Sequence, residues 1–122
     1  AIFLEKLFKG EQAVINGDGK QTRDYVYVAD VVKANVAALD KGDNDVFNIG
    51  TGVETDVNEI YNMLNTVTGA NMPEKHGPAK SGEQQRSVLD IKKAGDILGW
   101  HPDYDFARGV RETVKFFKKY EL

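Results

Sequence analysis

Residues 17–32, with the sequence Gly-Asp-Gly-Lys-Gln-Thr-Arg-Asp-Tyr-Val-Tyr-Val-Ala-Asp-Val-Val, decide the fold class. The glycines at the start are typical of a tight turn, because glycine adopts positive φ without steric cost. The β-branched and aromatic residues within 23–28 predict a strand. Asp30 is placed to cap a helix that we expect to end near Asp40. A turn, a strand and a helix in direct succession indicate a mixed α/β fold.

The sequence on both sides of this stretch adds further helical and extended patterns. Residues 2–10 have the spacing of an amphipathic helix, and residues 13–16 form a short apolar run. Downstream we expect a helix over about residues 56–68, with Thr55 as its N-cap and Gly69 at its end. The remaining expected elements are a compact strand over residues 46–49, a helix over 90–98 capped by Asp90, and a last helix over 106–120.

Residues 70–86 interrupt this alternation, since they are polar, contain two of the three prolines and show no period. A loop of this length inside a domain is usually functional or disordered. The expected strands are too few for a complete doubly wound sheet. We therefore expect residues 1–122 to form one small mixed α/β domain.

The composition is that of a folded globular domain. Of the 122 residues, 41% are hydrophobic and 29% are charged, as in ordinary soluble domains. The 16 basic and 19 acidic residues are interspersed and give a net charge of −3. Because nucleic-acid-binding surfaces normally carry a basic excess, we expect no nucleic-acid partner.

Neither cysteine chemistry nor membrane insertion is expected. The chain contains no cysteine, which fits a reducing cytoplasm, and no apolar run approaches the roughly 20 residues that span a bilayer. Residues 2–10 start as a helix already under way, with no Ser, Thr, Asp or Asn before them as a cap. We therefore expect the chain to be part of a longer, cytoplasmic protein.

The sequence shows no self-sufficient active site. Residues 46–52 share the strand and Gly-x-Gly turn that open a dinucleotide-binding fingerprint, but Thr55 replaces the third glycine. A lysine four places after a tyrosine would lower the pKa of the phenol for proton transfer, and no tyrosine in the chain is followed by one. His76 and His101 are isolated, so we expect no metal site and no catalytic triad.

Several cations are suited to holding an anion. Arg23 opens the expected strand directly after the turn, and Lys80 and Arg86 lie in the long polar stretch. Arginine can bind two phosphate oxygens at once, whereas lysine offers a point charge. From the residues alone, pairing of Arg23 with Asp24 or another nearby acid is the simpler interpretation.

Three motifs are similar to those of one family. Residues 17–32 closely resemble the Gly-Asp-Gly-x-Gln-x-Arg-Asp-Tyr-Val-Tyr-Val-x-Asp-Val-Val segment of extended short-chain dehydrogenases that act on sugar nucleotides. Residues 47–52, Phe-Asn-Ile-Gly-Thr-Gly, resemble a second motif of the family, and residues 87–102 resemble its Ser-x-x-Asp-x-x-Lys-Ala and Leu-Gly-Trp-x-Pro ending. The resemblance covers nearly the whole chain in the right order and is strongest for UDP-glucose 4-epimerases.

The resemblance implies a set of substrate contacts. It places Arg23 on the diphosphate of a UDP-sugar and the main-chain groups of Val14 and Asn16 on the uracil. It also places the family's second phosphate-binding arginine at Lys80, which loses the bidentate fork, and a ribose-contacting acid at Glu83. The implied set is completed by Asn48 on the nucleotide side and by Arg86 as a substitute for the lost fork.

The resemblance also implies a division of labour. NAD and the Tyr-x-x-x-Lys pair would belong to an N-terminal Rossmann domain outside this chain, so that we expect no cofactor here. The chain would be the C-terminal, sugar-nucleotide-binding portion of a UDP-glucose 4-epimerase, inactive alone and packed against that domain. Apolar surface left uncovered would favour a homo-oligomer. The open alternatives are a sugar-nucleotide 4,6-dehydratase or decarboxylase, and a noncatalytic nucleotide-binding or interaction module.

Overall fold

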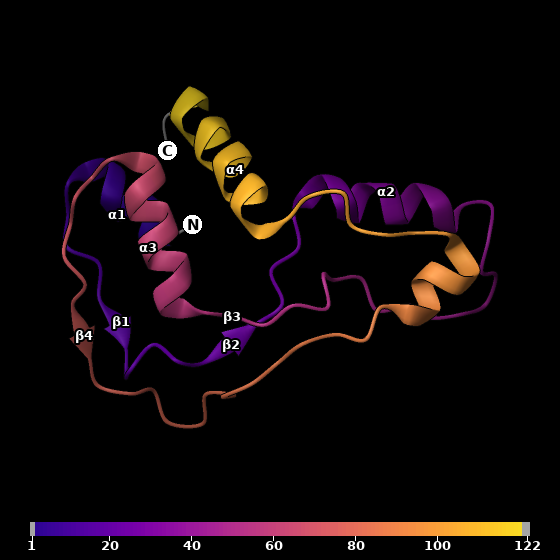
Figure 1. Ribbon diagram of the computed structural model, residues 1–122, viewed down its shortest axis with the longest axis horizontal. Coiled ribbons are helices and arrows are strands. Elements are labelled where there is room, and N and C mark those ends of the chain that lie inside the picture. The colour runs from indigo at the N-terminus through magenta and orange to yellow at the C-terminus, as the bar shows by residue number, and fades with distance from the viewer. Residues whose placement is uncertain (1, 121–122) are drawn as a thin grey trace.

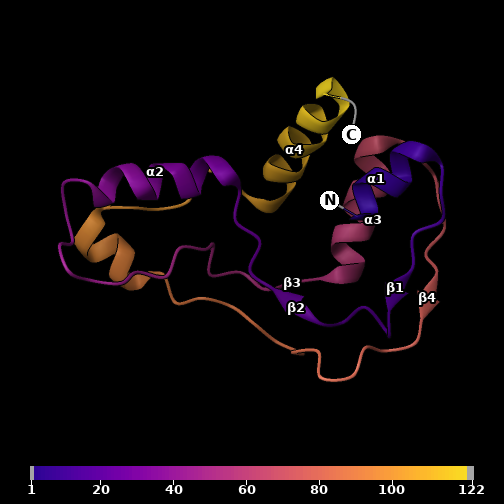
Figure 2. The same ribbon diagram turned by 180° about the vertical axis from the view of Figure 1, so that it is seen from behind.

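The computed structural model describes residues 2–120. Helices α1 (Ile2–Lys9), α3 (Val57–Thr68) and α4 (Phe106–Tyr120) gather at one end of the molecule (Figure 1). Helix α2 (Val28–Ala38) and the π-helical segment η1 (Ala94–Leu98) lie together at the other end, as the view from behind in Figure 2 also shows. We call the first group, with residues 10–16 and 70–77, the body, and we call α2, residues 46–49 and residues 94–100, which include η1, the arm.

Short strands hold the long connections in place. In the body, β1 (Ile15–Asn16) pairs in parallel with β4 (His76–Gly77), and Ile15 lies opposite His76. Between the body and the arm, β2 (Thr22–Arg23) pairs antiparallel with β3 (Thr55–Asp56). Helices and short strands therefore alternate along the chain, which confirms the predicted mixed α/β class. The predicted structureless stretch 70–86 contains β4, because residues 13–16 offer it a partner far away in the sequence.

Two predicted strands are wrong in their extent. The strand expected over residues 23–28 is confined to β2, because β3 supplies only two residues for pairing. The aromatic residues that suggested it pack instead on the region of α4, with Tyr27 against Tyr104 at 4.5 Å between ring centroids. Residues 46–49 are not part of a sheet within the described chain.

The helix caps also differ from the prediction. Tyr27 stands at the N-cap of α2, while Asp30 is buried in the first turn and accepts hydrogen bonds from the main-chain N–H groups of Asp103 and Tyr104 at 2.9 and 3.1 Å. Asp30 therefore fastens α2 to the segment before α4. Helix α3 is capped by Asp56 and not by Thr55, as a reciprocal capping box with Glu59, and it ends at Gly69 as predicted. Thr55 is buried in β3. At the predicted cap of the 90–98 helix, Asp90 accepts a hydrogen bond from the Lys92 N–H at 2.9 Å.

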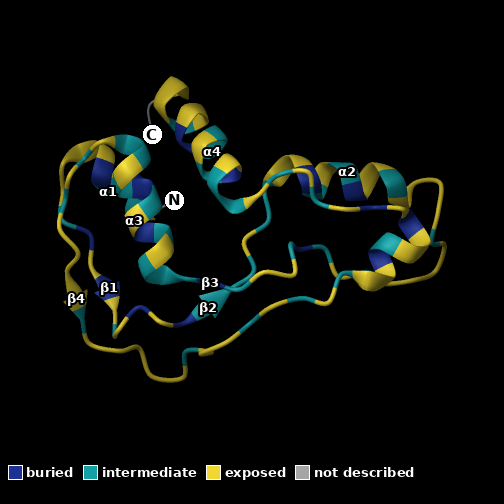
Figure 3. Ribbon diagram, viewed as in Figure 1, coloured by how far each residue is buried: buried dark blue, intermediate teal, exposed yellow. Residues whose placement is uncertain are grey.

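Each end of the molecule has its own apolar core (Figure 3). In the arm, the Trp100 indole N–H donates to the Asp30 carbonyl at 2.9 Å, so that even the polar atom of this buried ring is paired. The buried residues of the body are Leu4, Leu7, Ala13, Ile15, Tyr61, Leu64 and Val114, and those of the arm are Ala34, Ala94, Leu98 and Trp100.

The described residues 2–120 lack two further kinds of feature. None of their helices is long and apolar enough to cross a membrane. Their His, Asp and Glu side chains nowhere gather in threes close enough to hold a metal ion.

Candidate functional site

The long polar segment folds back onto the turn and strand that follow β1. The Thr22 N–H donates to the Gln85 carbonyl at 2.9 Å, and a Cβ atom on Gly17 would lie 3.2 Å from the Cβ of Ala79. Residues from two distant parts of the sequence therefore share one surface. We call Asn16, Gln21, Arg23, Lys80 and Glu83 on this surface the β1–β2 site.

Arg23 is the best-positioned cation of this site. Its Nη1 donates to the carbonyls of Thr22 at 2.6 Å and Gln84 at 2.7 Å, which fix a partly buried guanidinium at the end of β2. Within residues 2–120 it forms no salt bridge, and its Nε and Nη2 make no hydrogen bond. The simpler interpretation, pairing of Arg23 with Asp24 or another acid, is therefore wrong for the described chain. A held arginine with unused donors is suited to an anion.

Asp24 serves a different loop. Its carboxylate accepts hydrogen bonds from the N–H of Thr51 at 2.7 Å, the Thr51 hydroxyl at 2.6 Å, and the N–H groups of Gly52 at 2.9 Å and Leu89 at 3.3 Å. Burial alone would raise the pKa of Asp24, but these hydrogen bonds outweigh it and lower the pKa. A Cβ on Gly50 would lie 2.5 Å from the same carboxylate.

The main-chain N–H groups of the Gly-x-Gly turn thus already bind an anionic group of the same chain, the Asp24 carboxylate. The N–H groups that would face a pyrophosphate in a dinucleotide fingerprint are bonded to Asp24. The residues of this turn do not fit an NAD site. This agrees with the interpretation that the turn only resembles the fingerprint.

Gln21 is a member of the site that sequence reasoning missed. Its side chain is 5% exposed, and its Nε2 faces the Asn16 carbonyl at 3.2 Å and the Glu83 carboxylate at 3.3 Å. One buried amide therefore links two of the predicted contacts. A glutamine beside a polar turn carries no pattern that predicts burial, so only the fold shows this role.

The other predicted uracil and phosphate contacts lie nearby. Since Ile15 and Gly17 donate their N–H groups to the β4 side, the main-chain groups of Val14 and Asn16 face away from β4. Within residues 2–120 the main-chain groups on that edge of β1 make no hydrogen bond except the one between the Asn16 carbonyl and Gln21. Lys80 is exposed, and its carbonyl accepts the Glu83 N–H at 3.3 Å.

Arg86 is committed to another partner. Its Nε and Nη2 donate to the two carboxylate oxygens of Glu54 at 3.0 and 2.7 Å, and the Thr22 hydroxyl donates to the same carboxylate at 2.8 Å. These hydrogen bonds, that of Arg86 first, lower the pKa of Glu54 to about 2. The structure therefore does not bring Arg86 to Arg23 as a second free cation.

Asn48 is separate from the β1–β2 site. It lies in the arm, where its Nδ2 donates to the Asp90 carbonyl at 3.3 Å. It lines a shallow hollow with Lys92 and Lys93. Within the described chain it contacts none of the other predicted substrate contacts.

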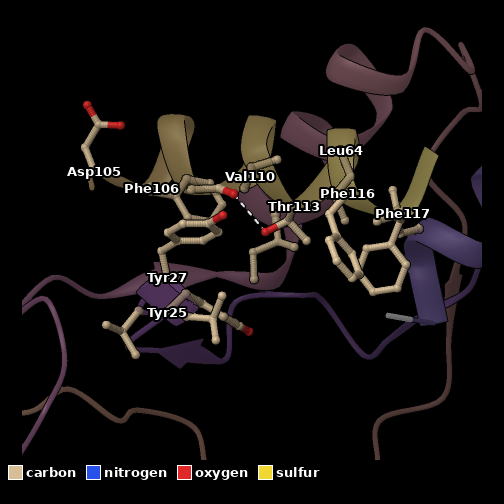
Figure 4. A pocket seen from close by; sticks show the side chains of 14 residues that line it. Tyr25, Tyr27, Leu64, Asp105, Phe106, Val110, Thr113, Phe116 and Phe117 are labelled. Carbon is tan, nitrogen blue, oxygen red and sulfur yellow. Dashed lines mark hydrogen bonds between the residues drawn. The ribbon is translucent and has the colours of Figure 1, made fainter. Parts of the chain in front are cut away.

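A large apolar cavity lies on the inner side of the body. Its volume is about 700 Å³, and it is bounded by residues 25–28, α3 and α4 (Figure 4). The aromatic rings of Phe106, Phe116 and Phe117 face into it along α4. Asp105 is the only charged side chain among its lining residues. A cavity of this composition suits apolar side chains better than a nucleotide.

The model of the GDP-mannose 4,6-dehydratase family matches residues 2–113, which is most of the chain. The chain belongs to this family of sugar-nucleotide epimerases and dehydratases. The resemblance carried by residues 17–32, 47–52 and 87–102 is thereby confirmed.

Individual members agree closely with this chain. A putative UDP-glucose 4-epimerase of Methanocaldococcus jannaschii is 43% identical over 118 residues, which are 97% of this chain and 38% of that protein. The crystal structure of Thermotoga maritima UDP-glucose 4-epimerase with UDP-glucose superimposes with a TM-score of 0.94 at 45% identity, over 98% of this chain and 38% of that one. The UDP-glucose 4-epimerase of Thermus thermophilus in complex with NAD gives a TM-score of 0.85 at 33% identity, over 96% and 39%. The chain thus spans less than two fifths of the length of these family members.

Proposed function

We propose that residues 1–122 are the C-terminal, sugar-nucleotide-binding portion of an NAD-dependent UDP-glucose 4-epimerase. The proposal is supported by two related UDP-glucose 4-epimerases, one determined with UDP-glucose and one with NAD, of which the chain matches less than two fifths. The NAD and the residues that exchange hydride and proton with the sugar would belong to the larger part outside this chain. The chain alone would then bind UDP and leave the sugar unchanged.

The observation that carries the proposal is the state of Arg23. Its guanidinium is held by two main-chain carbonyls, and within the described chain it has no acidic partner. Holding Arg23 in advance reduces the conformational entropy lost when a diphosphate binds. In this proposal Nε and Nη2 of Arg23 contact the diphosphate, and Lys80 contributes a second, more mobile charge.

The nucleoside would lie along the open edge of β1. Main-chain groups of Val14 and Asn16 would face the uracil, and Glu83 would accept a hydrogen bond from the ribose. Gln21 keeps Asn16 and Glu83 in register through its buried amide. Asn48 stays a predicted nucleotide contact. Because it lies in the arm, only a bound ligand or a part of the protein outside this chain could connect it to the β1–β2 site.

The reaction proposed for the parent protein explains why the UDP part of the substrate would be held by contacts of its own. Inversion at C4 by transient oxidation requires the sugar to present both faces while it stays bound. Contacts to the nonreacting UDP can hold the substrate through this rotation and place C4 for reaction. The chemistry of hydride exchange is supplied by NAD when it is bound.

A chimera tests the proposal. The matching 38% of the T. maritima enzyme would be replaced by this chain, and UDP-glucose epimerisation would be measured for Arg23→Gln and Arg86→Gln. Loss of a charge-assisted contact of about 1.5–3 kcal/mol should lower kcat/KM of the Arg23 variant by about 10- to 100-fold. Arg86→Gln is the matched control, because its side chain is paired with Glu54. Equal effects of the two substitutions would contradict the role of Arg23.

The second candidate reaction is that of a sugar-nucleotide 4,6-dehydratase or decarboxylase. It is favoured by the matching family model, which is that of a GDP-mannose 4,6-dehydratase. These reactions differ at the sugar, whereas the β1–β2 site is proposed to bind the nucleotide. Product analysis of the complete enzyme would separate them. A noncatalytic nucleotide-binding module would retain UDP binding and give no product in any complete form of the protein.

A further inference from the structure

His76 joins the two chain segments that carry the β1–β2 site. It lies on β4, and its ring contacts two acceptors at once: Nδ1 lies 2.8 Å from the Gly17 carbonyl, and Nε2 lies 3.2 Å from the Glu74 carboxylate. Gly17 directly follows Asn16, and His76 lies shortly before Lys80 in the sequence. The ring therefore fixes the turn beside Asn16 to the segment that leads to Lys80.

The two contacts are satisfied together only when the ring is protonated. A carbonyl oxygen and an ionised carboxylate accept hydrogen bonds and cannot donate them. Nδ1 must therefore carry a hydrogen to bind Gly17, and Nε2 must carry one to bind Glu74, which is the imidazolium form of His76. A neutral ring keeps one of these hydrogens, so that one of the two acceptors faces a nitrogen lone pair. Loss of the proton thus breaks one side of the contact.

Both charged groups that act on the ring within the described chain favour the proton, since Glu74 and Asp18 are acidic. Glu74 also accepts a hydrogen bond from the Asn62 side chain of α3 at 2.6 Å. The contact with His76 and then that with Asn62 lower the pKa of Glu74, so that its carboxylate is ionised at neutral pH. The hydrogen bond to the Gly17 carbonyl first, and then Glu74, raise the pKa of His76 above the ordinary 6.5.

Two further contacts hold Gly17 against β4 and the residues that follow it. The Gly17 N–H donates to the Gly77 carbonyl at 3.0 Å, and a Cβ atom on Gly17 would lie 3.2 Å from the Cβ of Ala79. With His76 on its carbonyl, Gly17 is held by three residues of one short segment. Release of the carbonyl would leave the turn less firmly fixed to the segment that carries Lys80.

We propose that His76 is a proton-dependent clasp for the β1–β2 site: when its ring is protonated, the turn at Gly17 and the segment of Lys80 are held together, and a sugar nucleotide binds more tightly. The inference rests on the proposed binding of a sugar nucleotide at this site. Because coupling between two binding events is reciprocal, a bound nucleotide should in turn hold the proton on His76 more strongly. The contact is formed below the ordinary pKa of 6.5 and is lost as the pH rises through the raised pKa.

The test measures binding of UDP-glucose to this chain by NMR at about pH 5.5 and about pH 8, on either side of the histidine titration. UDP-glucose is the probe because its diphosphate lacks the terminal phosphate group of UDP, which itself titrates near neutral pH. The dissociation constant should be about 2- to 5-fold lower at the acidic pH, as expected for an exposed charged contact. The pKa of His76, followed by NMR, should be higher with UDP-glucose than without it.

Two variants separate the clasp from a simple effect of charge. His76→Gln has no proton to lose, so its affinity should be the same at both pH values. In Glu74→Gln, the new NH₂ group can donate to Nε2 of a neutral ring while the amide oxygen still accepts from Asn62. The contact is then complete without the proton, and the affinity should not fall at the higher pH. His101→Gln is the matched control, because the His101 side chain makes no hydrogen bond within residues 2–120, and it should keep the native pH dependence.

Three results would overturn the inference. Equal affinities of the native chain at both pH values, with binding that still requires Arg23, would exclude the clasp and leave the proposed function intact. A pH dependence that persists in Glu74→Gln would assign the effect to direct attraction between the charged ring and the diphosphate. Absence of UDP-glucose binding by the folded chain at both pH values would refute the proposed function, and with it the control of its affinity.

Discussion

Asp24 is predicted to be the main polar fastening between the β1–β2 site and the Gly-x-Gly turn, so that Asp24→Asn should destabilise the protein far more than a surface substitution. The carboxylate accepts two hydrogen bonds from Thr51, one from the Gly52 N–H and one from the Leu89 N–H. Asparagine keeps one oxygen, which can serve Thr51. Its NH₂ group would then face the N–H groups of Gly52 and Leu89, where donor meets donor.

The magnitude follows from the lost acceptors. Two charge-assisted hydrogen bonds are each worth about 1.5–3 kcal/mol, and leaving a donor unpaired has a similar cost. Gly52 is exposed, so water can replace one of these partners, whereas Leu89 is half-buried. The expected loss in the free energy of unfolding is therefore about 2 kcal/mol.

Urea unfolding provides the assay. Trp100 is the only tryptophan and is buried in the arm, so its fluorescence reports unfolding directly. Asp43→Asn is the matched control, because Asp43 is exposed and makes no side-chain hydrogen bond within residues 2–120; its effect should stay within about 0.5 kcal/mol. A loss in the free energy of unfolding for Asp24→Asn equal to that of the control, at unchanged m-value, would show that these hydrogen bonds do not stabilise the fold.

The same substitution has a pH signature. Hydrogen bonding lowers the pKa of Asp24 in spite of burial, below the ordinary 3.8. The contribution of Asp24 is therefore fully present above about pH 4 and is lost as the pH falls through the lowered pKa. The difference in the free energy of unfolding between the native protein and Asp24→Asn should therefore narrow as the pH falls below about 4. A difference that stays constant down to about pH 2 would contradict the assignment.

Two further predictions concern single residues. Gly19→Ala places a Cβ atom 1.9 Å from the Asn58 side-chain oxygen at a φ of +72°, so it should lower the free energy of unfolding by at least about 2 kcal/mol. Gly82→Ala, at a φ of +76° with nothing within 4 Å of the new Cβ atom, should lower it by about 1 kcal/mol. Equal losses for the two variants in urea unfolding would exclude the clash. The hydrogen bond to the Gly17 carbonyl, together with a neighbouring glutamate, raises the pKa of His76 above the ordinary 6.5, so its stabilisation is present below that pH and is lost as the pH rises through the raised pKa. An NMR titration that places the His76 pKa at or below 6.5 would contradict this contact.

The sequence predicts helices better than caps and strands. The amphipathic spacing of α1, α3 and α4 marks each helix correctly, because one face of each packs into the body core. Asp30 is predicted to be a cap, but α2 begins earlier, with Tyr27 as its N-cap, and Asp30 is instead a buried link to the segment before α4. A cap and a long-range acceptor have the same residue type, so only the fold separates them.

The candidate site shows the same division. The motif predicts Arg23 as a phosphate contact, but it does not predict that the adjacent Asp24 bonds to Thr51, 27 positions away, and not to Arg23. Gln21 is buried and its amide bonds to Glu83, 62 positions further along the chain, which no local pattern predicts. Residues 46–49 have the composition of a strand, but no other strand pairs with them within the described chain. Pairing is a property of two segments, and one sequence pattern specifies only one of them.

Binding of UDP to this chain is the most direct test of the role proposed for Arg23. NMR would follow the Arg23 side-chain Nε–H signal during titration with UDP, with uridine as the comparison and Arg23→Gln as the variant. We expect weak binding of UDP, with a dissociation constant on the order of 1 mM, or about −4 kcal/mol. UDP should shift the Arg23 signal and uridine should not, and binding should be lost in the variant. A folded chain whose Arg23 signal stays unmoved at about 10-fold that concentration, or whose binding survives Arg23→Gln unchanged, would contradict this role.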